Sequence, residues 1–316
     1  MRHPKNNILL QITATVGLSL LVPSSAPAVD ISWDQASSGI FGEGVNWTGG
    51  TAPGTPDTAV FDVADTFTVT FGQNQTNEAL SLRDGDVTFD LNSRTYRLEN
   101  RVRVGEGGGN VLLTIGGGGQ VVSASSSSIA LESGFTGNAS VTGVGSRWES
   151  ESFFHVGFFG DGLLTIADGG EVVSADNTIT GLTSGSTGTA TVTGENSRWT
   201  SGDGFFVGFD GDGTLTIADR GEVVSVAESS IGFGTDSTGT ATVTGVGSRW
   251  ESMGAFNVGG LGDGTLTIKS GGQVVTALSS AIGLEVGSSG TATVTGVGSL
   301  WEVGSFLRVG GFGDGT

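Results

Sequence analysis

Several residue types are scarce in this chain. Its 316 residues include no cysteine, one tyrosine, two histidines and five prolines. The lack of cysteine excludes disulfide bonds, thiolate metal ligands and a cysteine nucleophile. His155 is the only histidine beyond residue 28. A histidine-based catalytic triad or metal cluster would therefore depend on that one residue.

Basic residues are also few, since 13 lysines and arginines accompany 32 aspartates and glutamates, for a formal net charge of −19. This charge disfavours nucleic acid and anionic membranes as partners and attracts loosely held divalent cations. Beyond residue 28 no segment has the roughly 20 apolar residues that a membrane-spanning helix needs. We expect no nucleic-acid partner, no cofactor and no transmembrane helix in the mature chain.

Residues 1–28 have the pattern of an export signal. Arg2 and Lys5 precede a mostly apolar stretch over residues 8–22, and small residues at 26–28 offer a cleavage site. A membrane-spanning helix is the competing interpretation, but Gln11 and Ser19 interrupt the stretch. The sequence predicts that this segment is removed during export.

Glycine is abundant, with 58 residues, and it belongs to a repeat. Each repeat contains Gly-Asp-Gly, a Thr-rich alternating segment and a tryptophan. The tryptophans lie 51 residues apart, at Trp148, Trp199, Trp250 and Trp301. A fixed period of this size indicates an array of one structural unit, in which each copy buries its apolar face against the next.

Each 51-residue repeat divides into two similar halves. Leu266 matches Ala292 and Ile268 matches Val294, each pair 26 residues apart, and the same offset aligns Val275 with Trp301. The unit is thus about 25 residues with three short alternating strands. We predict a right-handed parallel β-helix, an all-β solenoid whose coils stack about 4.8 Å apart. A β-propeller is the alternative, but its four-stranded blades should not divide into two equal halves.

The period covers residues 102–316, which we assign to the solenoid. Residues 29–101 fall outside it and are predicted to form an N-terminal cap and irregular leading coils, because the first coil of a stack must hide an open strand edge. Thr316 ends the chain within a repeat. We therefore expect the array to be incomplete at its C-terminus.

The string Gly-Thr-Ala-Thr-Val-Thr-Gly-Val-Gly-Ser-Arg-Trp at residues 239–250, followed by Gly-Asp-Gly-Thr-Leu-Thr-Ile at 262–268, resembles the repeat associated with autotransporter (type V secretion) and PEP-CTERM proteins. The resemblance covers residues 102–316. It implies a β-helical passenger domain that is exported and is either exposed on the bacterial cell surface or secreted. If the protein is an autotransporter, the domain is associated with the outer membrane. It also implies a non-enzymatic stalk or adhesin, with surface glycans or other cell-surface components as candidate partners.

One candidate site is a line of aspartates, Asp161, Asp212, Asp263 and Asp314, which recur once per two coils. They could bind calcium, which prefers several oxygen ligands from adjacent turns. Because the intervening coil offers serine where an aspartate is needed, and the spacing of calcium-binding nonapeptide repeats is absent, we favour a turn-forming role and assign no metal-binding residue.

The Arg-Trp pairs suggest a second surface, on which a row of tryptophans binds sugars and arginine holds their carboxylates. We favour the alternative that each tryptophan packs in the core while the arginine faces outward, because neighbours on a strand point in opposite directions. Trp301, which follows Leu300 in place of arginine, fits packing better.

A polysaccharide-degrading β-helix enzyme is the remaining alternative. It would need a unique base beside clustered acids. Glu149 and Glu151 are close in sequence, and Lys269 is the only lysine past Lys5. Nothing in the sequence brings them together, so we assign no catalytic residue.

Overall fold

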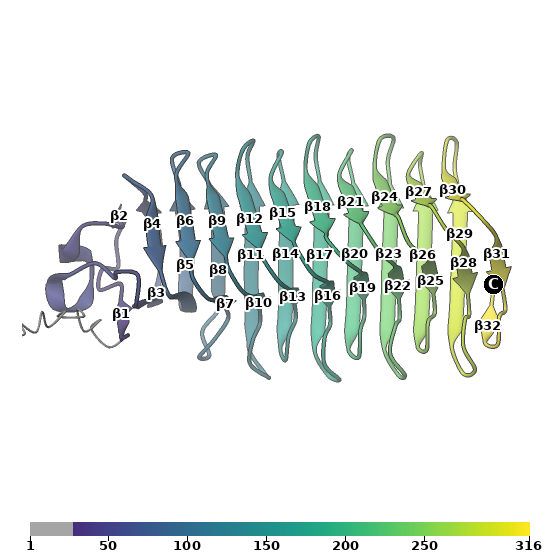
Figure 1. Cartoon of the computed structure of the whole chain (residues 1–316), viewed down its shortest axis with the longest axis horizontal. Coiled ribbons are helices and arrows are strands. Elements are labelled where there is room, and N and C mark those ends of the chain that lie inside the picture. Colours follow the sequence, from purple (N-terminus) through teal and green to yellow (C-terminus); the bar gives the residue numbers. More distant parts are fainter. Residues whose placement is uncertain (1–27) are drawn as a thin grey trace, which may run out of the picture.

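The computed structural model describes residues 28–316, which wind into a parallel β-solenoid of about 11 turns (Figure 1). Each strand pairs in parallel with its counterpart one coil away, as Ala241 does with Leu266. Among the described residues, helical structure is limited to two short 3-10 helices, η1 (Gly44–Asn46) and η2 (Thr48–Gly50). This arrangement confirms the predicted all-β solenoid with coils of about 25 residues, and a propeller is not formed.

Three rows of strands form three faces of the solenoid, connected by glycine-containing corners. The first face carries the longest strands: β3 (Thr58–Thr70), β5 (Ala79–Asp90), β8 (Val111–Gly116), β11 (Thr136–Thr142), β14 (Asp161–Ala167), β17 (Thr187–Thr193), β20 (Asp212–Ala218), β23 (Thr238–Thr244), β26 (Asp263–Lys269), β29 (Ser289–Thr295) and β32 (Asp314–Gly315).

The second face is a separate ten-stranded sheet: β4 (Gln75–Asn77), β6 (Thr95–Leu98), β9 (Gln120–Ser123), β12 (Arg147–Ser150), β15 (Glu171–Ser174), β18 (Arg198–Ser201), β21 (Glu222–Ser225), β24 (Arg249–Ser252), β27 (Gln273–Thr276) and β30 (Leu300–Val303).

The third face consists of three-residue strands: β1 (Asp30–Ser32), β7 (Val102–Val104), β10 (Ser127–Ile129), β13 (Phe154–Val156), β16 (Thr178–Thr180), β19 (Phe205–Val207), β22 (Ser229–Ile231), β25 (Phe256–Val258), β28 (Ser280–Ile282) and β31 (Leu307–Val309). Strands β3 and β5 run across the first and third faces, so these two faces join into one sheet near the N-terminus. The short β2 (Gly39–Ile40) pairs with the end of β3.

Alternating side-chain volume explains why the sequence repeats every two coils and not every coil. One type of coil places alanine on the first face, tryptophan on the second and phenylalanine on the third; the next type places leucine, valine and serine or threonine there. Two successive coils show the pattern: Ala190, Trp199 and Phe205, then Leu215, Val223 and Ser229, all buried. Alanine with tryptophan and leucine with valine thus fill similar volumes between the first and second faces, whereas phenylalanine on the third face is flanked by serine or threonine in the neighbouring coils.

The corners between the faces differ in length between the two types of coil. On the second face, consecutive partners are alternately 24 and 27 residues apart, as in Arg147 with Glu171 and Ser174 with Ser201. The alignment of Trp301 with Val275 is therefore wrong by one residue, and Trp301 pairs with Val274. The matches of Leu266 with Ala292 and of Ile268 with Val294 are confirmed.

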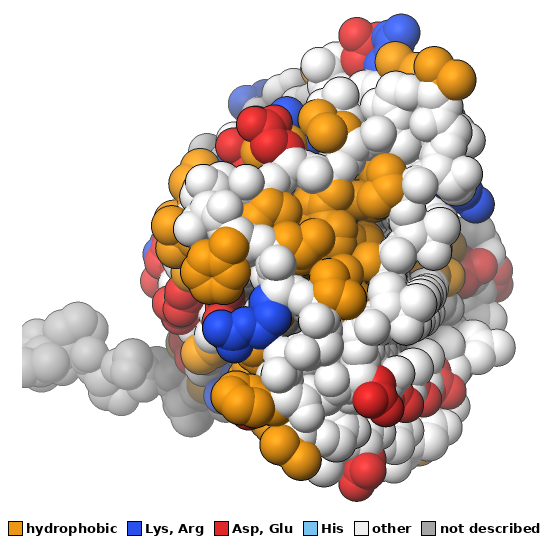
Figure 2. Space-filling view, turned by 90° about the vertical axis from the view of Figure 1, so that its right-hand side faces the viewer, with side chains coloured by type: hydrophobic (Ala, Val, Ile, Leu, Met, Phe, Trp, Pro, Cys, Tyr) orange, Lys and Arg blue, Asp and Glu red, His pale blue; other side chains and the backbone are white. Residues whose placement is uncertain are grey.

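The two ends of the described solenoid differ. At the N-terminal end an aromatic cluster covers the core, where Trp33 meets Trp47 edge to face at 5.1 Å and stacks on Phe67 at 5.9 Å. At the C-terminal end apolar core side chains lie open, as the centre of Figure 2 shows. Val294 is 48% exposed there, whereas its counterpart Val243 is fully buried.

No helix within residues 28–316 is long and apolar enough to cross a membrane. The predicted export signal at residues 1–28 lies outside the described residues, apart from Ala28.

Candidate functional surfaces

The repeated tryptophans are part of the core and not of the surface. Trp148, Trp199 and Trp250 have no exposed area, and each packs edge to face against a phenylalanine of its own coil, as Trp199 does with Phe205 at 4.9 Å. A sugar cannot stack on a ring that solvent does not reach. The alternative of a carbohydrate-binding tryptophan row is therefore wrong, and the packing interpretation is confirmed for these three residues.

The arginines beside them do face outward, on the second face, where they alternate with glutamates. Arg147 pairs with Glu171 of the next coil and with Glu149 of its own strand, and Arg198 pairs with Glu222 at 3.2 Å. The glutamate partners were not predicted from the sequence. The 24-residue offset between arginine and glutamate was the available signal, but it appears only once the unequal spacing of the corners is known.

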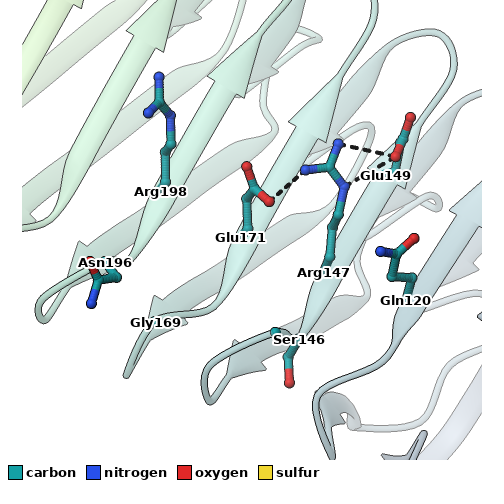
Figure 3. Close-up of a pocket in the computed structure, with 9 residues that line it drawn as sticks. Gln120, Ser146, Arg147, Glu149, Gly169, Glu171, Asn196 and Arg198 are labelled. Atoms are coloured by element: carbon teal, nitrogen blue, oxygen red, sulfur yellow. Dashed lines mark hydrogen bonds and ion pairs between the residues drawn. The ribbon is translucent and has the colours of Figure 1, made fainter. Parts of the chain in front are cut away.

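This row of charges lines a shallow groove of about 570 Å³ (Figure 3). Arg147 and Arg198 point into it beside Glu171, and Gln120 and Asn196 add amide groups. Each arginine is already ion-paired, and exposed ion pairs of this kind stabilise a fold by about 0–1 kcal/mol. The groove is a polar surface with balanced charge, suited to weak contacts with a polar partner.

The structure does not gather the four aspartates of the proposed calcium line. Asp161 and Asp212 begin β14 and β20, and Thr187 lies between them in the pairing register. Two coils separate one aspartate from the next, about 10 Å. Within residues 28–316 no three His, Cys, Asp or Glu side chains converge as metal ligands would.

The candidate catalytic residues also lie apart. Lys269 ends β26 on the first face, whereas Glu149 lies on the second face and Glu151 follows it at the corner. Glu151 accepts a hydrogen bond from Arg97 at 2.8 Å, and this bond lowers the pKa of the glutamate. A general acid requires the opposite shift. The three residues therefore form no acid–base pair.

His155 lies on the third face under a cover of aromatic side chains. It is 6% exposed, stacks on Phe153 at 5.8 Å and meets Phe158 edge to face at 4.9 Å. Its Nδ1 lies 3.4 Å from the hydroxyl of Ser128. Burial lowers the pKa of His155 to about 4. The residue is a neutral packing element at neutral pH.

This shift predicts an acid-sensitive contribution to stability. In the unfolded chain His155 takes up a proton near pH 6.5, and in the folded chain it does so only near pH 4. The stability that neutral, buried His155 contributes is therefore complete above pH 6.5 and is lost as the pH falls toward 4. We expect a loss on the order of 3 kcal/mol over this range. The variant His155→Phe, which copies Phe206 of the next repeat, lacks the titrating group. Urea unfolding of wild type and this variant at several pH values therefore measures the part of the pH dependence that comes from His155. A constant difference in unfolding free energy between the two proteins from pH 7 to pH 4 would contradict the assignment.

Comparison with known proteins yields one distant relative. A segment of 165 residues is 32% identical to the uncharacterized lipoprotein YdeK of Escherichia coli (strain K12). The match covers 49% of this chain and 12% of the relative. No protein-family model matches the chain. No solved structure matches it either.

Proposed function

We propose that this chain is an exported, non-enzymatic β-solenoid that serves as a stalk or attachment element at a bacterial cell surface. The observation that carries the proposal is the continuous stack of strands itself, in which polar residues recur outside and apolar residues fill the inside. Such a stack spreads its chemistry evenly and provides length and rigidity. The relative named as a lipoprotein supports a location in the cell envelope.

The autotransporter route and an adhesive role belong to the same proposal. The groove lined by Arg147 and Arg198 is the surface where glycans or other polar surface components would make repeated weak contacts.

Export can be tested directly with the full chain expressed in a Gram-negative bacterium. We expect the mature protein to begin at Val29 and to be degraded by protease added to intact cells, or to be found in the medium. Leu18→Arg should block both results, because a charge interrupts the apolar stretch of the signal. Retention of Met1 in a cytoplasmic wild-type protein would overturn the proposal. The proposal that the chain is non-enzymatic would be wrong if the purified protein cleaved uronic-acid polymers, measured as the release of new chain ends.

A further inference from the structure

One column of the solenoid does not follow the repeat. On the outer side of the third face, successive strands carry side chains of unrelated size and chemistry. In pairing order they are Arg103, Ser128, His155, Ile179, Phe206, Ser230, Asn257, Ala281 and Arg308. In a repeat protein a unique site requires a departure from the repeat, and this column provides one.

In two repeats an aromatic pair fills the space over this column. His155 packs on Phe158 at 4.9 Å, and 51 residues later Phe206 packs on Phe209 at 5.4 Å. The next repeat has Asn257 and Gly260 at these positions. Both rings are therefore missing from the third copy, while the chain around them keeps the same path.

A cavity of about 260 Å³ lies at this position, and its walls are mostly apolar. Phe233, Leu261 and Leu284 form the walls, and Asn257 and Gly260 lie where the aromatic pair of the preceding repeats would be. The volume is suited to a single aromatic ring with a short substituent. The space is thus shaped for the kind of group that the other repeats supply from their own chain.

The polar groups of the cavity indicate what the ligand carries besides its ring. Asn257 is half-buried and is the neutral polar side chain of the lining that solvent reaches, whereas Ser230 lies beneath the cavity with no exposed area. Glu228 and Glu285 also line the cavity, and no arginine or lysine does. Two carboxylates with no basic residue among the lining side chains favour a cationic group.

We propose that this cavity binds a small aromatic amine, with its ring against Phe233, Leu261 and Leu284 and its ammonium group near Glu228 and Glu285. The amide of Asn257 is the hydrogen-bonding group at the floor. This inference goes beyond the surface role proposed above and does not depend on it, because it requires only the folded solenoid.

The test uses the full mature chain and 2-phenylethylamine as the probe, followed by NMR titration. A ligand with so few atoms should bind with a dissociation constant on the order of 0.1–1 mM. Asn257→Phe, which restores the ring that Phe206 supplies in the preceding repeat, should abolish binding. Thr189→Phe makes a similar change in size on the first face and should leave binding intact. Circular dichroism confirms that each variant is folded.

A second comparison separates charge recognition from simple filling of the cavity. The neutral analogue 2-phenylethanol should bind several-fold more weakly than the amine. The double variant Glu228→Gln, Glu285→Gln should reduce the affinity of the amine to that of the alcohol and leave the alcohol unchanged. No binding of the amine at 10 mM, binding that survives Asn257→Phe, or equal affinities of amine and alcohol for the wild type would overturn the proposal.

Discussion

Replacing Trp199 by alanine is expected to lower the free energy of unfolding by about 3–5 kcal/mol. Trp199 is fully buried between Val172 and Val223 of the neighbouring coils and contacts Phe154 and Phe205 edge to face. Each coil is closed by hydrogen bonds to its neighbours, so the backbone has little freedom to collapse into the space. Urea unfolding monitored by circular dichroism measures the loss, with Val246→Ala, which is 78% exposed, as a control expected within about 0.5 kcal/mol of wild type.

The same experiment tests the compensation between large and small residues within a coil. Ala190→Leu alone should overpack its coil and cost about 1–3 kcal/mol. Combined with Trp199→Val it recreates the pair Leu215 and Val223 of the next coil, so the double variant should lose less than the sum of the two single variants. Strict additivity would show that the 51-residue period has another origin.

Most of the architecture could be predicted from the sequence, because the same pattern of strand and turn residues occurs in every repeat. The alternation in Thr-Leu-Thr-Ile identified the strands, and the echo at 26 residues identified the coil. Both follow from side-chain direction in a strand. The burial of Trp148 and its neighbours followed from the same principle, since the adjacent arginine had to point the other way.

What the sequence did not reveal depends on corners and on contacts between coils. The alignment of Trp301 with Val275 failed because the corner between the first and second faces differs in length between the two types of coil. The ion pairs of Arg147 and Arg198 remained hidden for the same reason. The covering of the third face by Phe158 and Phe209 could not be derived either, because their 51-residue spacing does not show that the loop folds back over the strand.

The repeat also explains where function can reside. Polar contacts on the second face recur from coil to coil, so they favour an extended partner held by many weak interactions. The third face instead differs at each coil, and its cavity at Ser230 and Asn257 occurs where one repeat has lost an aromatic pair. A solenoid with one individual pocket therefore combines two kinds of surface without any change in fold.

Gly213→Ala is expected to destabilise the protein by about 3 kcal/mol or more, although it adds one methyl group. A Cβ atom at Gly213 would overlap the backbone nitrogen of Gly208 and lie 2.6 Å from the carbonyl carbon of Val207. That nitrogen donates a hydrogen bond to the carbonyl oxygen of Thr180 in the preceding coil at 2.9 Å. Because the obstacle is backbone, no change of rotamer relieves it, and the contact between coils has to open.

Gly185→Ala is the matched control, because it separates lack of space from backbone conformation. Gly185 has a φ of +82° and nothing within 4 Å of an added Cβ, so its cost should be only about 1 kcal/mol, from the left-handed conformation. Equal losses in the two variants, measured by urea unfolding, would show that the glycines serve only as turn residues. A larger loss at Gly213 shows that glycine at the start of β20 allows the coils to approach closely, as do its partners Gly188 and Gly239 in the adjacent coils.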